Sequence, residues 1–193
     1  MRLVRLVAAL CLAALALVSS GSAQRPTFVG PVLDHPAPPP DFTLRDQSDR
    51  AVHLRALHGK VVLLTFLYTH CPDVCPITAA NLNTALRNLG GKRAHVAVLA
   101  VSVDPVGDTR SSVRRFIREH RLLPQFRYLT GRQAALQRVW RMYSVRAVRN
   151  KNDGGVDHTL YTLLVDRGGT ARVLFDSTAT PRAITHDVRQ LLP

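Results

Sequence analysis

The chain has little cysteine and even less methionine. Its 193 residues contain three cysteines, Cys11, Cys71 and Cys75, and two methionines, Met1 and Met142. So few cysteines exclude a disulfide-stapled scaffold, and a chain of this length can bury an adequate core without one. Because Met142 is the only methionine after the start, a methionine-rich metal site is also excluded. Any soft metal must then be held by cysteine and histidine.

Acidic residues are scarce as well. The sequence has 13 Asp and Glu against 26 Lys and Arg, for a formal net charge of +13. A balance this basic raises nucleic acid as a partner. The arginines are scattered, however, and the stretch SVRRFIREHR at residues 112–121 is typical of the solvated face of an amphipathic helix. We therefore expect no nucleic-acid partner, and favour attraction to an anionic membrane surface or to an acidic protein surface.

The apolar runs are short. Residues 6–18 are continuously apolar, but this run is shorter than the roughly 20 residues that cross a bilayer. Arg2 and Arg5 precede it, and small residues at suitable cleavage positions follow it. The pattern predicts a secretory signal peptide over residues 1–23, with an uncleaved membrane anchor as the alternative. We expect an exported protein, in the periplasm or at the periplasmic face of the inner membrane.

The leader is followed by a linker and one domain. Residues 24–40 are rich in proline and carry no periodic pattern, which predicts an extended linker. Residues 41–193 have the length of a single domain and contain no internal repeat.

Within this domain, strand and helix patterns alternate. Residues 41–54 show two short alternating segments around a polar turn, which predicts a β-hairpin. Two continuous apolar runs, residues 59–69 and 94–103, predict strands buried on both faces. Further helices and a final pair of strands are expected at residues 77–89, 109–121, 133–142 and 181–192, and at residues 158–166 and 171–175. This order predicts an α/β fold: a central mixed β-sheet flanked by helices on both faces, with an N-terminal β-hairpin.

Cys71 and Cys75 lie four positions apart, where the first buried strand gives way to its helix. An open α/β sheet places its chemistry at such a junction, and backbone N–H groups at a helix start favour a thiolate. Pro76 suits the first turn of that helix. Two thiols at this spacing can form a disulfide or share one ion. A structural disulfide, a redox-active pair and a metal site therefore all remain open.

Two thiolates leave a soft metal under-coordinated, and the chain has eight histidines. His158 is the leading candidate because it follows a Gly-rich loop at the head of a predicted strand, where polar residues reach the sheet edge. A Cys₂His set suits Cu(I) and also holds Cu(II) or zinc. The alternative is that His158 is a structural or surface histidine. His70 is a weaker candidate, and Asp73 and Asp157 are candidate hydrogen-bond acceptors that orient the site. The remaining histidines are expected at the surface: His35, His53, His58, His95, His120 and His186.

The segment FLYTHCPDVCP, followed by VDHT with its histidine 83 positions after Cys75, resembles the Sco/SenC family. The segment LAVSVDP adds to the likeness, which covers the chain from about residue 41 to its C-terminus. Members of the family are thioredoxin-like copper proteins that assist the assembly of cytochrome c oxidase. The resemblance implies that Cys71, Cys75 and His158 bind one copper ion per chain, as Cu(I), Cu(II) or both. One departure is VGDTR at residues 106–110, where the family usually has a charged residue and DTP.

The resemblance also implies a role and partners. The chain is expected to be a metallochaperone for the dinuclear copper centre, and not an enzyme. Its expected partners are the oxidase subunit that carries this centre, and another copper carrier or a thiol reductant. The alternative is an exported thiol–disulfide oxidoreductase, with Cys71 and Cys75 as a redox-active pair that reduces the client's ligand cysteines. A cysteine peroxidase fits poorly, because Tyr68 and Leu64 stand where such an enzyme has Thr and Pro.

Overall fold

The computed structural model describes residues 26–151 and 154–193. The predicted signal peptide, residues 1–23, lies outside the described residues. The strands are β1 Thr43–Arg45, β2 Ala51–His53, β3 Val61–Leu67, β4 Val96–Ser102, β5 Phe126–Leu129, β6 Ala147–Arg149, β7 Val156–His158, β8 Thr162–Val165 and β9 Ala171–Phe175. The helices are α2 Val74–Asn88, α3 Arg110–Glu119, α4 Gln133–Met142 and α5 Pro181–Leu191, with 3-10 helices η2 Arg55–Leu57 and η3 Gly90–His95. Among the helices in these two ranges, none has the length and apolar character that a bilayer crossing requires.

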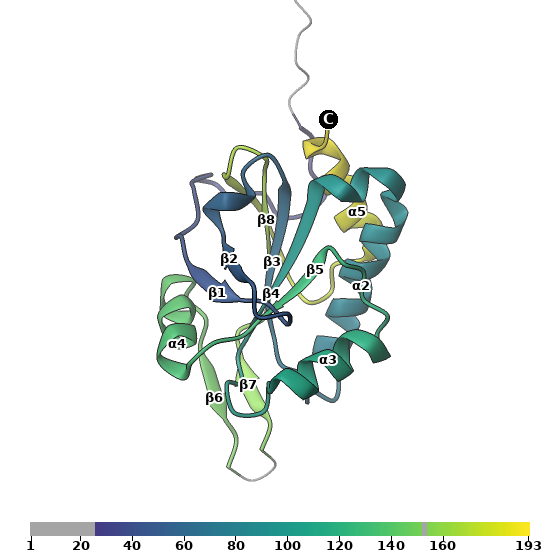
Figure 1. Cartoon of the computed structure of the whole chain (residues 1–193). Coiled ribbons are helices and arrows are strands. Elements are labelled where there is room, and N and C mark those ends of the chain that lie inside the picture. The colour runs from purple at the N-terminus through teal and green to yellow at the C-terminus, as the bar shows by residue number, and fades with distance from the viewer. Residues whose placement is uncertain (1–25, 152–153) are drawn as a thin grey trace, which may run out of the picture.

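A five-stranded sheet of order β5-β4-β3-β8-β9 forms the centre of the molecule (Figure 1). β3, β4 and β5 are parallel, whereas β8 and β9 are antiparallel to their neighbours. Every residue of β3 and β4 is buried, as expected of continuous apolar runs between two layers of structure. The predicted central mixed sheet is therefore confirmed.

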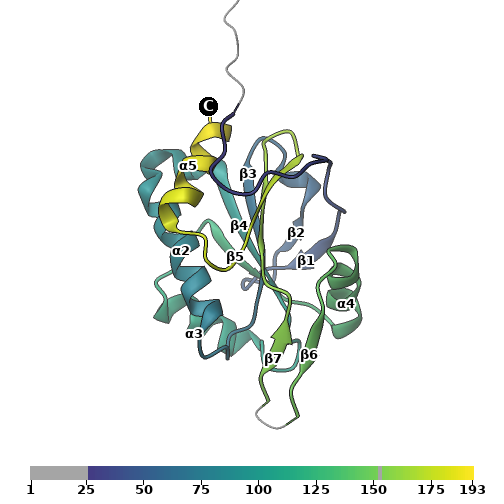
Figure 2. The same cartoon turned by 180° about the vertical axis from the view of Figure 1, so that it is seen from behind.

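Helices cover both faces of this sheet, as predicted (Figures 1 and 2). α2 and α3 connect the parallel strands β3, β4 and β5 in one direction across the sheet, so right-handed crossovers place both helices on the same face. α5 packs against α2 on that face. α4 leads the chain back from β5, and it lies on the other face together with the predicted N-terminal hairpin β1–β2.

The structure corrects the prediction in three places. β5 and β6 were not predicted, and the strand predicted over residues 158–166 is broken: β7 ends at His158 and β8 begins at Thr162. β7 pairs with β6 in a separate antiparallel ribbon, which projects from the end of the molecule opposite the C-terminus (Figure 1). The helix predicted from residue 77 begins at Val74. Cys75 therefore lies in the first turn of α2.

The described part of the predicted proline-rich linker packs on the domain. The backbone N–H groups of Val29 and Gly30 donate to the buried carboxylate of Asp187 at 2.8 and 2.9 Å. Leu33 donates its N–H to the carbonyl of Arg172 in β9 at 2.9 Å. This segment runs along β9 and α5, because polar groups of these elements satisfy its backbone N–H groups.

Candidate functional site

The two cysteines lie at the carboxyl end of β3, in the loop that leads into α2. Cys75 is fully buried, whereas Cys71 is partly exposed, and both are free thiols. The backbone N–H of Cys75 donates to the sulfur of Cys71 at 3.4 Å. Asp73, the N-cap residue of α2, makes no side-chain capping bond. The sulfur of Cys71 thus occupies the place where a capping side chain usually receives the first helical N–H groups.

The two thiols differ in pKa. The Cys75 thiol donates a hydrogen bond to the sulfur of Cys71. This bond is the largest cause of a lowered pKa at Cys71, and the backbone N–H groups of Asp73 and Cys75 and the Tyr68 hydroxyl add to it. Together they outweigh the effect of partial burial and lower the pKa of Cys71 to about 5. The same bond, together with burial, raises the pKa of Cys75. At neutral pH, Cys71 is therefore a thiolate that solvent can reach, and Cys75 is a buried thiol.

His158, at the end of β7, faces Cys75. Its Nε2 lies 3.7 Å from the sulfur of Cys75, although 83 positions separate the two residues. Its Nδ1 lies 3.0 Å from the carbonyl oxygen of Thr159. Because a carbonyl only accepts, Nδ1 carries the proton and Nε2 presents its lone pair towards Cys75. Burial lowers the pKa of His158, so the imidazole is neutral at pH 7.

Tyr68 connects the histidine to the cysteine loop, a role that was not predicted from the sequence. Its ring lies edge-on to that of His158, with 5.7 Å between the centroids. Its hydroxyl helps to lower the pKa of Cys71, and it accepts a hydrogen bond from the backbone N–H of Val156 in β7. No spacing in the sequence distinguishes this residue from the apolar residues of β3, which it directly follows.

Other predicted candidates lie elsewhere. Asp73 and Asp157 are exposed, and the bond from Nδ1 of His158 goes to a backbone carbonyl, so neither aspartate orients the histidine as predicted. His70 is exposed, and its Nδ1 lies 3.1 Å from the hydroxyl of Thr69. The six other histidines are exposed or half-buried. The exposed ones are His35, His53, His58 and His95. The two half-buried ones are His120, which packs on Phe116, and His186, which contacts Asp187.

A buried carboxylate holds the cysteine loop from beneath. The side chain of Thr109, the residue after Asp108, caps α3. Asp108 instead accepts bonds from the N–H and hydroxyl of Thr69, both at 2.8 Å, from Ser102 at 2.6 Å and from Tyr128 at 3.0 Å. Burial raises the pKa of Asp108. The loop after β3 is thereby fixed to β4 and β5.

An ion pair fixes the β6–β7 ribbon to the sheet. Arg149 in β6 pairs with the buried carboxylate of Asp104, in the loop after β4. Asp104 also accepts the backbone N–H of Gly107 at 2.9 Å. On β7, Val156 is buried against the body of the protein. These two contacts, together with the bond from the Val156 N–H to Tyr68, fix the ribbon and thereby the position of His158.

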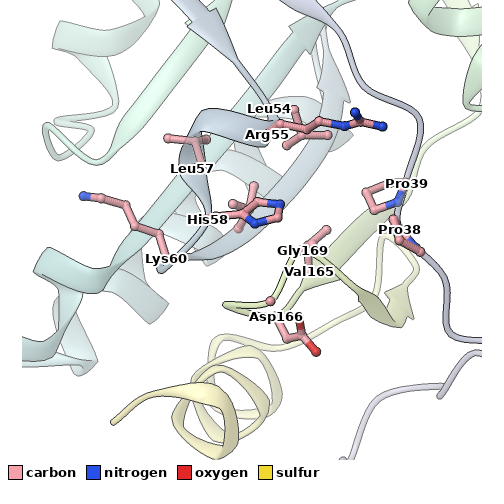
Figure 3. A pocket seen from close by; sticks show the side chains of 12 residues that line it. Pro38, Pro39, Leu54, Arg55, Leu57, His58, Lys60, Val165, Asp166 and Gly169 are labelled. Atoms are coloured by element: carbon pink, nitrogen blue, oxygen red, sulfur yellow. The ribbon is translucent and has the colours of Figure 1, made fainter.

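A cavity of about 290 Å³ lies at the opposite end of β3 (Figure 3). Its apolar wall is formed by Pro38, Pro39, Leu54, Leu57, Val62 and Val165. The polar side chains around it are those of Arg55, His58, Lys60 and Asp166. The seven residues of β3 separate it from the cysteine loop, which corresponds to about 20 Å at the rise of a strand. This cavity is not part of the thiol site.

The donor set at the thiol end suits a soft metal. Two sulfurs and a neutral imidazole come together, and Cys75 contacts both Cys71 and His158. In residues 26–151 and 154–193, no three His, Cys, Asp or Glu side chains already form a group that could hold a metal ion. An ion shared by the three donors therefore requires them to turn towards one point and the Cys75 thiol to lose its proton.

Comparisons with known proteins agree with this arrangement. Residues 34–193 match the family model described as SCO1/SenC. The structure of Bradyrhizobium japonicum ScoI with copper bound has a TM-score of 0.72 and 34% sequence identity, and the match covers 81% of this chain and 100% of that one. BsSco, a member of the Sco family of cytochrome c oxidase assembly proteins in which a disulfide switch was identified, has a TM-score of 0.67 and 25% identity, with 83% and 97% covered.

A curated relative, the mitochondrial protein SCO2 homolog of Bos taurus, is 30% identical over 156 residues. That match covers 78% of this chain and 58% of the relative, so the chain spans less than two thirds of the relative's length. The similarity to the Sco structures confirms the predicted thioredoxin-like fold. The fold, the cysteine motif and the family match lead to one conclusion: the chain belongs to the SCO1/SenC family.

Proposed function

We propose that the chain binds copper through Cys71, Cys75 and His158 and acts as a copper chaperone in the assembly of the dinuclear copper centre of cytochrome c oxidase. The observation that carries this proposal is the lone pair of Nε2 on His158, directed at the sulfur of Cys75 at 3.7 Å. Thiol exchange needs no imidazole at this point, whereas a metal with two thiolate ligands does. The copper-bound structure of the similar ScoI supports the choice of metal.

The arrangement suits a cargo that must leave again. Cys71 is already a thiolate, and Cys75 gives up its proton when the ion binds. Partial exposure of Cys71 leaves the ion within reach of a partner's ligands, so it can pass from one protein to the other by ligand exchange. The proposed acceptor is the oxidase subunit that carries the dinuclear site.

The test is copper retention by the reduced protein under challenge with a chelator. Wild type is expected to keep about one copper ion per chain, and His158→Ala to lose affinity by more than about 10-fold. His95→Ala, which removes an exposed histidine far from the thiols, serves as the matched control and should behave as wild type. Equal retention by all three proteins, or no retention by wild type, would show that the histidine assignment is wrong.

A second candidate function is thiol–disulfide exchange, and the unequal thiol pKa values favour it. The Cys71 thiolate would attack a partner's disulfide and form a mixed disulfide, and Cys75 would then displace the partner's second thiol. Two electrons pass to the partner as the pair is oxidised. Oxidase maturation in cells carrying His158→Ala separates the two functions. Failed maturation with intact thiol exchange supports copper transfer, and normal maturation supports the oxidoreductase.

We further propose an exported location, in the periplasm or at the periplasmic face of the inner membrane. The leader pattern of residues 1–23 supports it. Cell fractionation with mass measurement of the mature chain tests the proposal. A mature chain that begins after Ala23 indicates cleavage, and an intact chain in the membrane fraction indicates an anchor. An intact chain in the cytoplasm would contradict export.

A further inference from the structure

Unpaired cations lie on α3, beside the thiol end of the molecule. Arg114, Arg115 and Arg118 are exposed on the solvent side of this helix. In the described part of the chain, none of the three takes part in an ion pair, whereas Arg110 pairs with Asp49 at 3.4 Å. Their charge is therefore available to an approaching molecule.

This surface borders the cysteine loop. A hollow of about 210 Å³ is lined by Thr69 and His70 from the loop and by Arg115 and Glu119 from α3. Arg115 thus shares a wall with the residue that precedes Cys71. Figure 1 shows α3 at the same end of the molecule as the β6–β7 ribbon. Across residues 110–151, which include α3, α4 and β6, Glu119 is the only acidic residue to offset the arginines.

Exposed apolar side chains lie on the helix turn that carries Cys75 and on the loop after β4, whose Gly107 lies beside His70. On the first turn of α2, Val74 is 39% exposed and Ile77 is 51% exposed, and Val106 in the loop after β4 is 70% exposed. Apolar side chains gathered beside a reactive group, with charge at their border, are typical of a protein contact surface. A lipid surface seated here would cover Cys71, whereas a protein partner brings its own ligands to it.

We propose that Val74, Ile77 and Val106, together with the three arginines of α3, form a docking surface for a protein whose matching face is apolar where it meets the valines and isoleucine and acidic where it meets α3. The arginines attract the partner before contact, and the apolar side chains are covered once it has docked. The proposal rests on the proposed function only for the chemistry at the contact, which is either transfer of copper or exchange of thiols. The preference for negative charge holds for copper transfer and thiol exchange alike.

Two disulfide probes that differ in charge measure this preference without copper. The reduced protein is mixed with the dianion dithiobis(nitrobenzoate) or with neutral dithiodipyridine, and the released thiolate is followed by stopped-flow absorbance. In each case the Cys71 thiolate displaces one arylthiolate, and Cys75 displaces the second with loss of its proton. Two thiols are oxidised and one disulfide is reduced. The ratio of the two rates reports the electrostatic potential at Cys71.

For wild type, the anionic-to-neutral rate ratio is expected to fall by about 3- to 10-fold between low and high salt. The triple variant Arg114→Gln, Arg115→Gln, Arg118→Gln is expected to show the lower ratio already at low salt. The matched control is Lys92→Gln, Arg93→Gln, Arg167→Gln, which removes the same charge at the opposite end of the sheet. It should keep most of the wild-type ratio, and an unchanged rate with the neutral probe shows that each variant keeps the reactive Cys71 thiolate.

Acceptor experiments complete the test. With the soluble copper-binding domain of the oxidase subunit as acceptor, the α3 variant is expected to slow transfer and to flatten its dependence on salt. Equal rate ratios in both triple variants would overturn the proposal in favour of net charge alone. An unchanged ratio in the α3 variant, with loss of binding to phosphatidylglycerol vesicles, would overturn it in favour of a membrane surface. Loss of copper by wild type would contradict the proposed function and leave the probe ratios valid.

Discussion

Arg149 and Asp104 form an ion pair between the β6–β7 ribbon and the loop after β4. The side chain of Asp104 is 4% exposed and that of Arg149 is 43% exposed, so the carboxylate depends on the pair more than the guanidinium does. His158 ends the same ribbon, directly opposite Ala147. The position of the imidazole therefore depends on a charged contact outside the thiol site.

Removing that contact should loosen the ribbon. Arg149→Gln leaves a buried carboxylate with fewer partners, so we expect the free energy of unfolding to fall by about 1–3 kcal/mol. Hydrogen exchange should also speed up at the backbone amides of β7. Arg45→Gln breaks an exposed pair with Asp49 and is the matched control, with an expected loss of less than about 1 kcal/mol. Equal losses in urea unfolding would mean that the pair does not hold the ribbon.

Gly107 has no room for a side chain. A Cβ at this position would lie 2.1 Å from Oδ2 of Asp104 and 3.2 Å from Nδ1 of His70. Gly107→Ala should therefore displace Asp104 and lower the free energy of unfolding by about 1–3 kcal/mol. Gly91→Ala, where no atom lies within 4 Å of the added carbon, should change it by less than about 0.5 kcal/mol. Thermal or urea unfolding of the two variants tests this difference.

Alkylation should reveal the low pKa of Cys71. In the reduced protein, the rate with iodoacetamide is expected to level off above a pKa of about 5, whereas an ordinary thiol reacts faster up to about pH 8.5. Cys75→Ala removes the strongest hydrogen bond to the thiolate and should raise this pKa most. Tyr68→Phe removes a weaker one and should raise it less. If the alkylation rate of both variants still levels off near pH 5, hydrogen bonds from Cys75 and Tyr68 are not the cause of the low pKa.

The same shift makes stability depend on pH. Because the pKa of Cys71 is lower in the folded than in the unfolded protein, the unfolded state binds more protons between about pH 5 and pH 8.5. The free energy of unfolding of the reduced protein should therefore rise with pH across this window. The raised pKa of Cys75 acts in the opposite direction only above about pH 8.5. Urea unfolding of wild type and Cys71→Ala, under reducing conditions, should show a steeper rise in wild type, because the lowered pKa of His158 adds a smaller rise to both proteins below about pH 6.5.

Asp108 should have the reverse effect at lower pH. Burial raises its pKa in the folded state, so the folded protein holds the proton longer than the unfolded chain does. Its contribution to stability is full below about pH 3.9 and is lost as pH rises through the folded pKa. The difference in unfolding free energy between wild type and Asp108→Asn should therefore shrink as pH rises from about 4 to 7. A difference that grows over this range would contradict the direction of the shift.

The centre of the fold was predictable because its signal is local. β3 and β4 are continuous apolar runs, and each is buried along its whole length. β5 and β6 carry no such signal. β5 has four residues and includes the half-buried Arg127, and β6 has three residues, of which Val148 and Arg149 are exposed. Both strands exist because a neighbouring strand satisfies their backbone, and a pattern in one segment does not record that partner.

The approach of His158 to Cys75 is similarly non-local. It depends on where β7 ends, and this end is set by the backbone N–H of Thr159, which donates to the carbonyl of Arg146 at 3.0 Å. Position in the sequence made His158 the leading candidate ligand but left a structural or surface histidine as the alternative, and the family resemblance favoured the ligand role. The carbonyl of Thr159, which fixes the tautomer, belongs to the backbone and has no signature in side-chain type.

The chain ends have a practical consequence. The C-terminus and the first described residues lie at the end of the molecule opposite the β6–β7 ribbon (Figure 1). An affinity handle, a fluorophore or an electrode linker attached at the C-terminus therefore points away from Cys71. Protein immobilised in this way presents its thiolate to solution in one uniform orientation. Voltammetry would then follow metal loading at Cys71, and surface plasmon resonance would follow the binding of a partner to the surface around it.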